Sequence, residues 1–118
     1  MKKRTMKKNE ILDLSFDFAL EIIKLVKYLK ANKEFVMSSQ LLRSGTSIGA
    51  NITEAQAAQS TNDFIAKMSI SSKEARETEY WLRLLDKSNY LDEYQNKSVV
   101  FNSIQSIVKL LTSLALSL

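Results

Sequence analysis

Residues 43–55 read RSGTSIGANITEA, and this stretch decides the fold. Its two bulky apolar residues, Ile48 and Ile52, are one helical turn apart, and Gly45 and Gly49 lie one turn before each of them. A glycine inside a helix costs about 1 kcal/mol relative to alanine. Two such glycines therefore predict a helix that packs closely against a neighbour, and we assign Ile48, Ile52 and the intervening Asn51 to that packing surface.

Four segments of the chain carry apolar residues at helical spacing, with short polar breaks between them. The first covers about residues 9–31, the second 38–58 and the third 62–88, and the fourth carries a seam from Val100 to Leu118. The chain has two glycines and no proline, so it has few tight turns. The pattern predicts an all-α protein, an antiparallel up-down-up-down four-helix bundle over residues 9–118.

The second and third predicted helices both carry residues with small side chains at their centres. Gly45 and Gly49 are expected to face Ser71 and Ala75, because small residues let two helix axes approach closely. Asn51 is expected to hydrogen-bond the neighbouring helix if it is buried, the alternative being contact with a ligand or partner.

Several polar residues sit where helices should begin. The first helix is expected to start at Asn9 and the second at Ser38 or Ser39. For the fourth helix, Asp92 is a candidate N-cap with Gln95 in the capping-box position.

The first predicted helix is more hydrophobic than one core requires. Beside its core stripe it carries a second stripe, which predicts an oligomer interface because a single core needs an apolar face of little more than about 100°. The alternative is a wide core in an irregular bundle. The predicted interface residues are Leu12, Phe16, Leu20 and Ile23.

The basic residues are unevenly distributed. Residues 1–8 hold five of the 17 basic residues and no acid, and the remaining 12 basic residues face 13 acidic ones, so residues 9–118 sum to −1. We interpret residues 1–8 as a basic flexible tail, which serves either as a nucleic-acid arm or as a solubilising extension. The candidate nucleic-acid-binding residues are Lys2, Lys3, Arg4, Lys7, Lys8 and, on the body, Arg43.

The composition disfavours catalysis and metal binding. The chain has no histidine and no cysteine, the commonest general base and two common metal ligands. Glu74, Glu77 and Glu79 are interleaved with basic residues at i,i+4 spacing, which favours a charged surface over a catalytic carboxylate pair. Trp81 is interpreted as an interface anchor, with a stacking platform for bases as the alternative. We predict no enzymatic activity, no cofactor and no metal.

No segment resembles a secretory signal or a membrane span. Acidic residues interrupt the apolar part of the N-terminal region, and the longest uncharged run, residues 98–108, is shorter than the ~20 residues that a span needs. We therefore expect a cytoplasmic protein with no membrane partner.

The segment 39–55, SQLLRSGTSIGANITEA, closely resembles the 23S rRNA-intervening sequence protein family. The similarity continues through Ser60-x-x-Asp63-Phe64 and the run 73–82, KEARETEYWL, and it ends near residues 89–91. The resemblance implies a four-helix bundle that assembles into a homopentamer, and for most members the function is unknown. The family is also similar to the accessory protein of diversity-generating retroelements, which binds nucleic acid and a reverse transcriptase.

Together these features predict a non-enzymatic, homo-oligomeric scaffold or adaptor, with association to RNA or ribonucleoprotein as its more specific form. The alternative is a retroelement-type accessory protein that binds RNA or DNA and a reverse transcriptase. The near-neutral body distinguishes this chain from that accessory protein, whose body is strongly basic.

Overall fold

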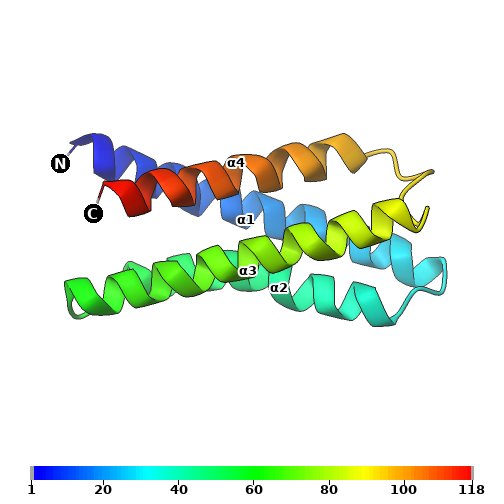
Figure 1. Cartoon of the computed structure of the whole chain (residues 1–118), viewed down its shortest axis with the longest axis horizontal. Helices are drawn as coiled ribbons and strands as arrows, with labels where there is room; N and C mark the ends of the chain where they lie inside the picture. Colours follow the sequence, from blue (N-terminus) through cyan, green and yellow to red (C-terminus); the bar gives the residue numbers. More distant parts are fainter. Residues whose placement is uncertain (1, 118) are drawn as a thin grey trace.

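The computed structural model describes the backbone of residues 2–117 and the side chains of residues 10–117. Four helices follow in chain order: α1 (Lys2–Ala31), α2 (Val36–Ala55), α3 (Thr61–Lys87) and α4 (Lys97–Leu116). They run antiparallel in sequence, so both ends of the chain lie at the same end of the bundle (Figure 1). The predicted up-down-up-down four-helix bundle is confirmed.

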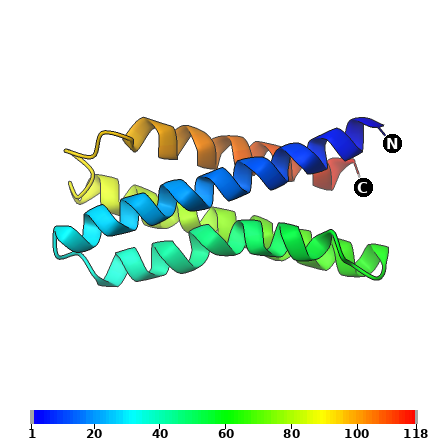
Figure 2. The same cartoon turned by 180° about the vertical axis from the view of Figure 1, so that it is seen from behind.

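The helices form a square in which each packs on its neighbours in sequence and α1 packs on α4. Within the described residues no Cα atom of α1 lies within 8 Å of one in α3, and none of α2 within 8 Å of one in α4, so these pairs are diagonal. Figure 1 shows the molecule with α3 and α4 in front, and Figure 2 shows the opposite face, with α1 and α2 in front. The square therefore has four outer seams, and the seam between α1 and α2 lies on the face opposite the seam between α3 and α4.

The residues that recur at helical spacing in the four predicted segments, here called the four stripes, form the core with few exceptions. Leu14 and Phe64 are only half-buried and Gln59 is exposed, whereas Leu118 lies outside the described residues. Every other large apolar member of the four stripes is buried. Leu91, from the break before α4, adds to the core. Helical periodicity alone thus identified the inward face of each helix.

The tightest helix pair is α2 with α3, as expected, but hydroxyl side chains rather than glycines make the contact. The Ser71 hydroxyl donates to the carbonyl oxygen of Ile48 at 2.9 Å, and the Thr78 hydroxyl donates to Ser44 Oγ at 3.0 Å. All four residues are buried. Small side chains that satisfy one another allow α3 to lie close along α2.

The two glycines face α1, so the prediction that they contact α3 is wrong. A Cβ on Gly45 would lie 3.0 Å from both Cγ1 and Cγ2 of Ile22, and a Cβ on Gly49 would lie 3.2 Å from Ser15 Oγ. Both partners belong to α1. Helix α2 is therefore small-sided on two faces, with hydroxyl residues toward α3 and glycines toward α1.

The N-terminus of α2 is capped by a buried carboxylate. The helix begins at Val36, before the predicted start, and Phe35 in the N-cap position makes no side-chain bond. Glu34 instead accepts hydrogen bonds from the backbone N–H groups of Met37 (3.2 Å) and Ser38 (2.7 Å). A carboxylate at a helix N-terminus satisfies free donors and complements the helix dipole.

The starts of α1 and α4 also differ from expectation, whereas α3 lies within one residue of its predicted bounds. Helix α1 begins at Lys2, so its backbone includes Asn9 and the segment predicted to be a flexible tail; the side chains of Lys2, Lys3, Arg4, Lys7 and Lys8 lie outside the described residues. Helix α4 begins only at Lys97, and its N-cap residue, Asn96, makes no side-chain cap bond. The capping box predicted from Asp92 and Gln95 is therefore wrong.

The turns form without glycine. Lys33 and Asn89 adopt positive φ angles of 66° and 69° just beyond α1 and α3. At each site the next residue's N–H bonds five residues back, from Glu34 to Leu29 and from Tyr90 to Leu85. This is the Schellman arrangement, which usually places glycine at the left-handed position. Both glycines of the chain lie instead within α2, where close packing requires them.

Helix α4 is long and apolar enough to cross a membrane by length and composition alone, with a mean hydropathy of 1.5. Uncharged runs alone do not reveal this property in the sequence, because Lys109 interrupts the run. The stripe of α4 that contains Val100, Ile104 and Ile107 is buried in the bundle. The core helix of a soluble protein can pass the same test, but only 28% of the apolar window of α4 is buried in the bundle.

Candidate functional site

The predicted interface stripe lies on the outer surface of α1. Phe16, Leu20 and Ile23 are 65%, 46% and 37% exposed, and Leu12 is half-buried. Their spacing of three to four residues places them along one line of the helix. The core residues of the same helix, such as Phe18 and Ile22, point inward. The structure thus brings the four predicted residues together on one line of α1, with three of them exposed and Leu12 packed against the core, and we call this line the α1 stripe.

A shallow groove of about 210 Å³ runs beside the α1 stripe, between α1 and α2. Its floor is shallow because Ser15, Gly49 and Ala50 carry little side-chain volume where the two helices meet. Phe16 and Ala19 border the groove on the α1 side. It lies along the α1–α2 seam, the face that is in front in Figure 2. Projecting aromatic residues next to a groove are typical of helix–helix interfaces.

Helix α4 also carries apolar residues beside its core stripe. Phe101, Val108 and Leu110 are half-buried and pack against the core. For these three residues the alternative interpretation, a wide core, is therefore the better one, whereas Ala115, the fourth additional apolar residue of this helix, is exposed. Exposed large apolar side chains also occur outside α1, among them Ile65 and Ile70 on α3 and Val99 and Leu116 on α4. On α1, Phe16, Leu20 and Ile23 follow one line of the helix.

Arg43 lies in an ion-pair cluster that links α2 to α3. Its guanidinium donates from Nη1 to Glu74 Oε2 at 3.0 Å and from Nη2 to Glu77 Oε2. Trp81 Nε1 donates to the same Glu77 oxygen at 2.9 Å. The sequence favoured pairs within α3 at i,i+4 spacing, whereas the structure pairs two of the three acids across helices. Arg43, a predicted nucleic-acid contact, is thus already bound to two carboxylates.

Trp81 is half-buried, and its ring packs edge-on against Tyr80 at 5.3 Å between centroids. With its indole N–H satisfied by Glu77, Trp81 helps to fix the ion-pair cluster. Asn51 is also half-buried, but its amide donates to the carbonyl oxygen of Ser47 in its own helix at 2.9 Å. The expected bond from Asn51 to a neighbouring helix is therefore wrong, because its amide bonds one turn back along α2.

A second exposed apolar site was not predicted. Phe35 and Val36, at the corner between α1 and α2, are 56% and 77% exposed. The sequence contains an indication of this site, because two adjacent apolar residues directly follow a polar break. Because the α2 cap is formed by Glu34, this pair is held at the helix start with its side chains outward.

Two titratable side chains among the described residues have shifted pKa values, those of Lys67 and Tyr94. No cluster of three or more potential metal-ligating residues occurs among the described residues. A hydrogen bond to Glu54 and that carboxylate's charge raise the pKa of Lys67, and burial with a contribution from Glu21 raises the pKa of Tyr94. Both shifts arise from interactions within the bundle, with a hydrogen bond as the largest cause for Lys67 and burial as the largest cause for Tyr94.

Residues 7–113 match the family described as 23S rRNA-intervening sequence protein. Comparison with curated proteins gives no match. Among solved structures, the chain is similar to a protein of unknown function from the S23 ribosomal protein family of Bacteroides thetaiotaomicron. The two share 54% identity with a TM-score of 0.84, over 91% of this chain and 96% of the other. The match covers all four helices, including the small-sided α2, and the chain belongs to the 23S rRNA-intervening sequence protein family.

Proposed function

We propose that this protein is a non-enzymatic, cytoplasmic scaffold that works as a homo-oligomer, assembled through the α1 stripe. The observation that carries the proposal is the exposure of Phe16, Leu20 and Ile23 on a helix whose other face is already buried in the core. A contiguous exposed apolar surface on a small bundle marks an interaction site. The absence of histidine and cysteine from the sequence supports a role without catalysis.

The composition around the α1 stripe supports a specific interface. Asp13, Asp17 and Lys24 are exposed on the same helix and provide a polar rim around the apolar centre. Each large apolar side chain buried at the interface contributes about 1.5–3 kcal/mol. Identical chains joined through different surfaces form closed rings when the rotation permits. The resemblance of the chain to its family favours five copies.

The test is to place a charge in the α1 stripe. Phe16→Asp should convert the oligomer to monomers at micromolar concentration, because an unpaired carboxylate would have to be buried at each contact. Ile70→Asp is the matched control, since Ile70 is an exposed apolar residue on α3, outside the stripe. Light scattering on both variants, with circular dichroism to confirm helix content, gives the comparison.

The expected result is dissociation by Phe16→Asp and an unchanged mass for Ile70→Asp. An oligomer that survives Phe16→Asp would show that the α1 stripe is not the contact surface. Dissociation by Ile70→Asp alone would move the interface to α3.

RNA association is the more specific form of the proposal, and the uneven charge supports it. Five basic residues lie within residues 2–8, whereas residues 9–118 sum to −1. Arg43 pairs with Glu74 and Glu77, which leaves the N-terminal residues as the principal source of phosphate contacts. Several copies of this segment on one oligomer would bind a long RNA with avidity.

Removal of the basic segment should abolish RNA binding. Five phosphate contacts per chain predict a slope of about −3.5 to −4.5 for log affinity against log salt, through counterion release. Base preference should be weak, because lysines contact phosphates rather than base edges. The measurement is an RNA titration of the full chain and of a chain that begins at Asn9, at two salt concentrations. Equal binding by both chains would place the contact on the bundle, and no binding by either would leave the scaffold without RNA.

A further inference from the structure

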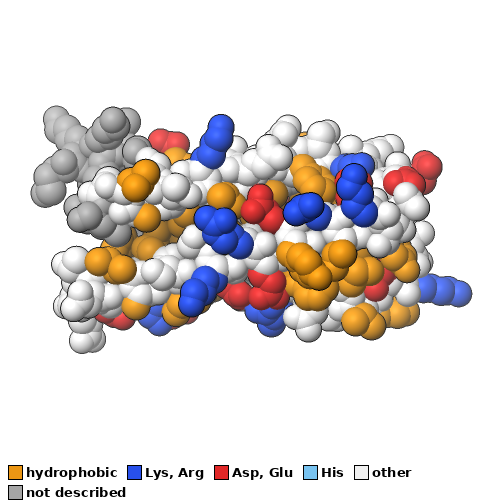
Figure 3. Space-filling view, in the orientation of Figure 1, with side chains coloured by type: hydrophobic (Ala, Val, Ile, Leu, Met, Phe, Trp, Pro, Cys, Tyr) orange, Lys and Arg blue, Asp and Glu red, His pale blue; other side chains and the backbone are white. Residues whose placement is uncertain are grey.

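A hollow lies on the face opposite the α1 stripe, in the seam between α3 and α4. Its volume is about 380 Å³. Hydrophobic side chains are visible in the recess between the two helices in Figure 3. Nine residues line it: Ile65, Met68, Ser69, Ser72, Arg76, Leu111, Thr112, Leu114 and Ala115. Pockets for small molecules are usually about 300–1,000 Å³, mostly apolar, with a few polar groups that orient the ligand.

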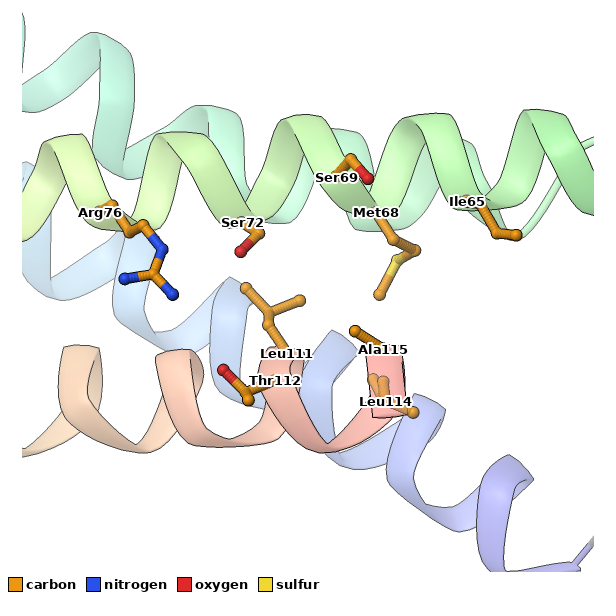
Figure 4. Close-up of a pocket in the computed structure, with 9 residues that line it drawn as sticks. All are labelled: Ile65, Met68, Ser69, Ser72, Arg76, Leu111, Thr112, Leu114 and Ala115. Carbon is orange, nitrogen blue, oxygen red and sulfur yellow. The ribbon is translucent and has the colours of Figure 1, made fainter. Parts of the chain in front are cut away.

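The hollow is polar at one end and apolar at the other. Figure 4 shows the Arg76 guanidinium pointing from α3 toward α4, with Ser72 and Thr112 nearby. Met68, Leu114 and Ala115 lie toward the opposite end. Arg76 and Ser72 are one turn apart on α3, so both reach the same end of the hollow. A ligand that fits this gradient has an anionic head and an apolar tail.

Arg76 is available to bind an anion. No hydrogen bond or ion pair involves it among the described residues, and none of the nine lining residues is acidic. The nearby acids Glu74 and Glu77 are engaged by Arg43 on another face of α3. A guanidinium holds a carboxylate through two parallel N–H···O bonds.

The hydroxyl groups of Thr112 and Ser72 differ in whether they can add to carboxylate binding by Arg76. Thr112 Oγ1 already donates its hydrogen to the carbonyl oxygen of Val108 at 2.9 Å. The Ser72 hydroxyl is half-buried and has no assigned partner within the described residues, so it is free to donate to a carboxylate oxygen held by Arg76.

We propose that the α3–α4 hollow binds a free medium-chain carboxylic acid, with the carboxylate on Arg76 and Ser72 and the acyl chain against Met68, Leu111 and Ala115. At about 30 Å³ for each non-hydrogen atom, as for liquid water, the hollow holds about 12 atoms. Decanoate has this size. The site uses α3 and α4, so it is independent of assembly through α1.

The test is a titration of the full chain with decanoate, well below the concentration at which it forms micelles, followed by amide NMR. Decanoate should shift the amides of residues 65–76 and 111–115 saturably, with a dissociation constant on the order of 1 mM. Arg76→Gln should weaken binding about tenfold. Lys73→Gln removes the same charge from an exposed position on α3 outside the hollow and should leave binding unchanged.

Two further experiments separate the contribution of the carboxylate from that of the acyl chain. Decanol, which has no charge, should bind the original chain and Arg76→Gln equally. Ala115→Phe should abolish binding by filling the apolar end, and because Ala115 is exposed the fold should tolerate it. The proposal is overturned if decanoate gives no saturable shifts, if Arg76→Gln binds it as well as the original chain, or if Ala115→Phe leaves binding intact.

Discussion

Replacement of Ile48 by alanine should lower the free energy of unfolding by about 2–5 kcal/mol, the range for large-to-small changes in a packed core. Ile48 is fully buried at the centre of α2. Its carbonyl oxygen accepts the Ser71 hydroxyl at 2.9 Å, which fixes the spacing of α2 and α3 around the side chain. The helices therefore cannot close over the missing atoms, and a cavity remains.

Urea unfolding at fixed protein concentration measures this loss, since the stability of an oligomer depends on concentration. Ile65→Ala is the control, because Ile65 is 39% exposed at the surface of α3, and it should have a clearly smaller effect. A loss below about 1 kcal/mol for Ile48→Ala would show that the site collapses and that the α2–α3 contact is looser than described.

Gly45→Leu should destabilise the bundle by about 1–3 kcal/mol through overpacking. Even a Cβ at this position would lie 3.0 Å from two carbon atoms of Ile22, and leucine adds three more carbons in the same direction. The better helix propensity of leucine offsets part of this cost. Thermal or urea unfolding gives the net effect.

A double-mutant cycle identifies the helix that Gly45 contacts. If Ile22 on α1 is the partner, Gly45→Leu should cost much less in an Ile22→Ala background, because the added side chain occupies the vacated space. Equal costs in both backgrounds would contradict the contact with α1.

The sequence determined which face of each helix is buried, but not which neighbour that face meets. Gly45 and Gly49 were correctly assigned to helix packing, yet their partner was chosen because α3 is small-sided. Periodicity along one helix contains no information about the rotation of the next. The overlooked signal was Ser15, a small residue within the apolar first helix that lies opposite Gly49.

The same limit applies to the charged residues. Spacing along α3 suggested pairs within that helix, while Arg43 reaches Glu74 and Glu77 across 31 and 34 residues of chain. Such a pair depends on the register of α2 against α3, which tertiary packing sets. Among the candidate site residues, those on a single helix, such as the α1 stripe, were therefore predictable as a group.

Helix ends were the least predictable part of the fold. The capping carboxylate of α2 comes from Glu34, a residue assigned to a polar break, and acts through a side chain that folds back on the backbone. Lys33 takes the left-handed position where glycine is usual. Both choices depend on the approach of α1 to α2 rather than on local preference alone.

We propose above that exposed apolar residues on α1 assemble this bundle into a defined oligomer. Native mass spectrometry of the original chain at micromolar concentration tests it most directly. We expect a single assembly whose mass is an integral multiple of 13.4 kDa, with five copies favoured by the family resemblance. A dimer or tetramer would keep the interface and reject the number of copies, and a species of 13.4 kDa alone would contradict the claim.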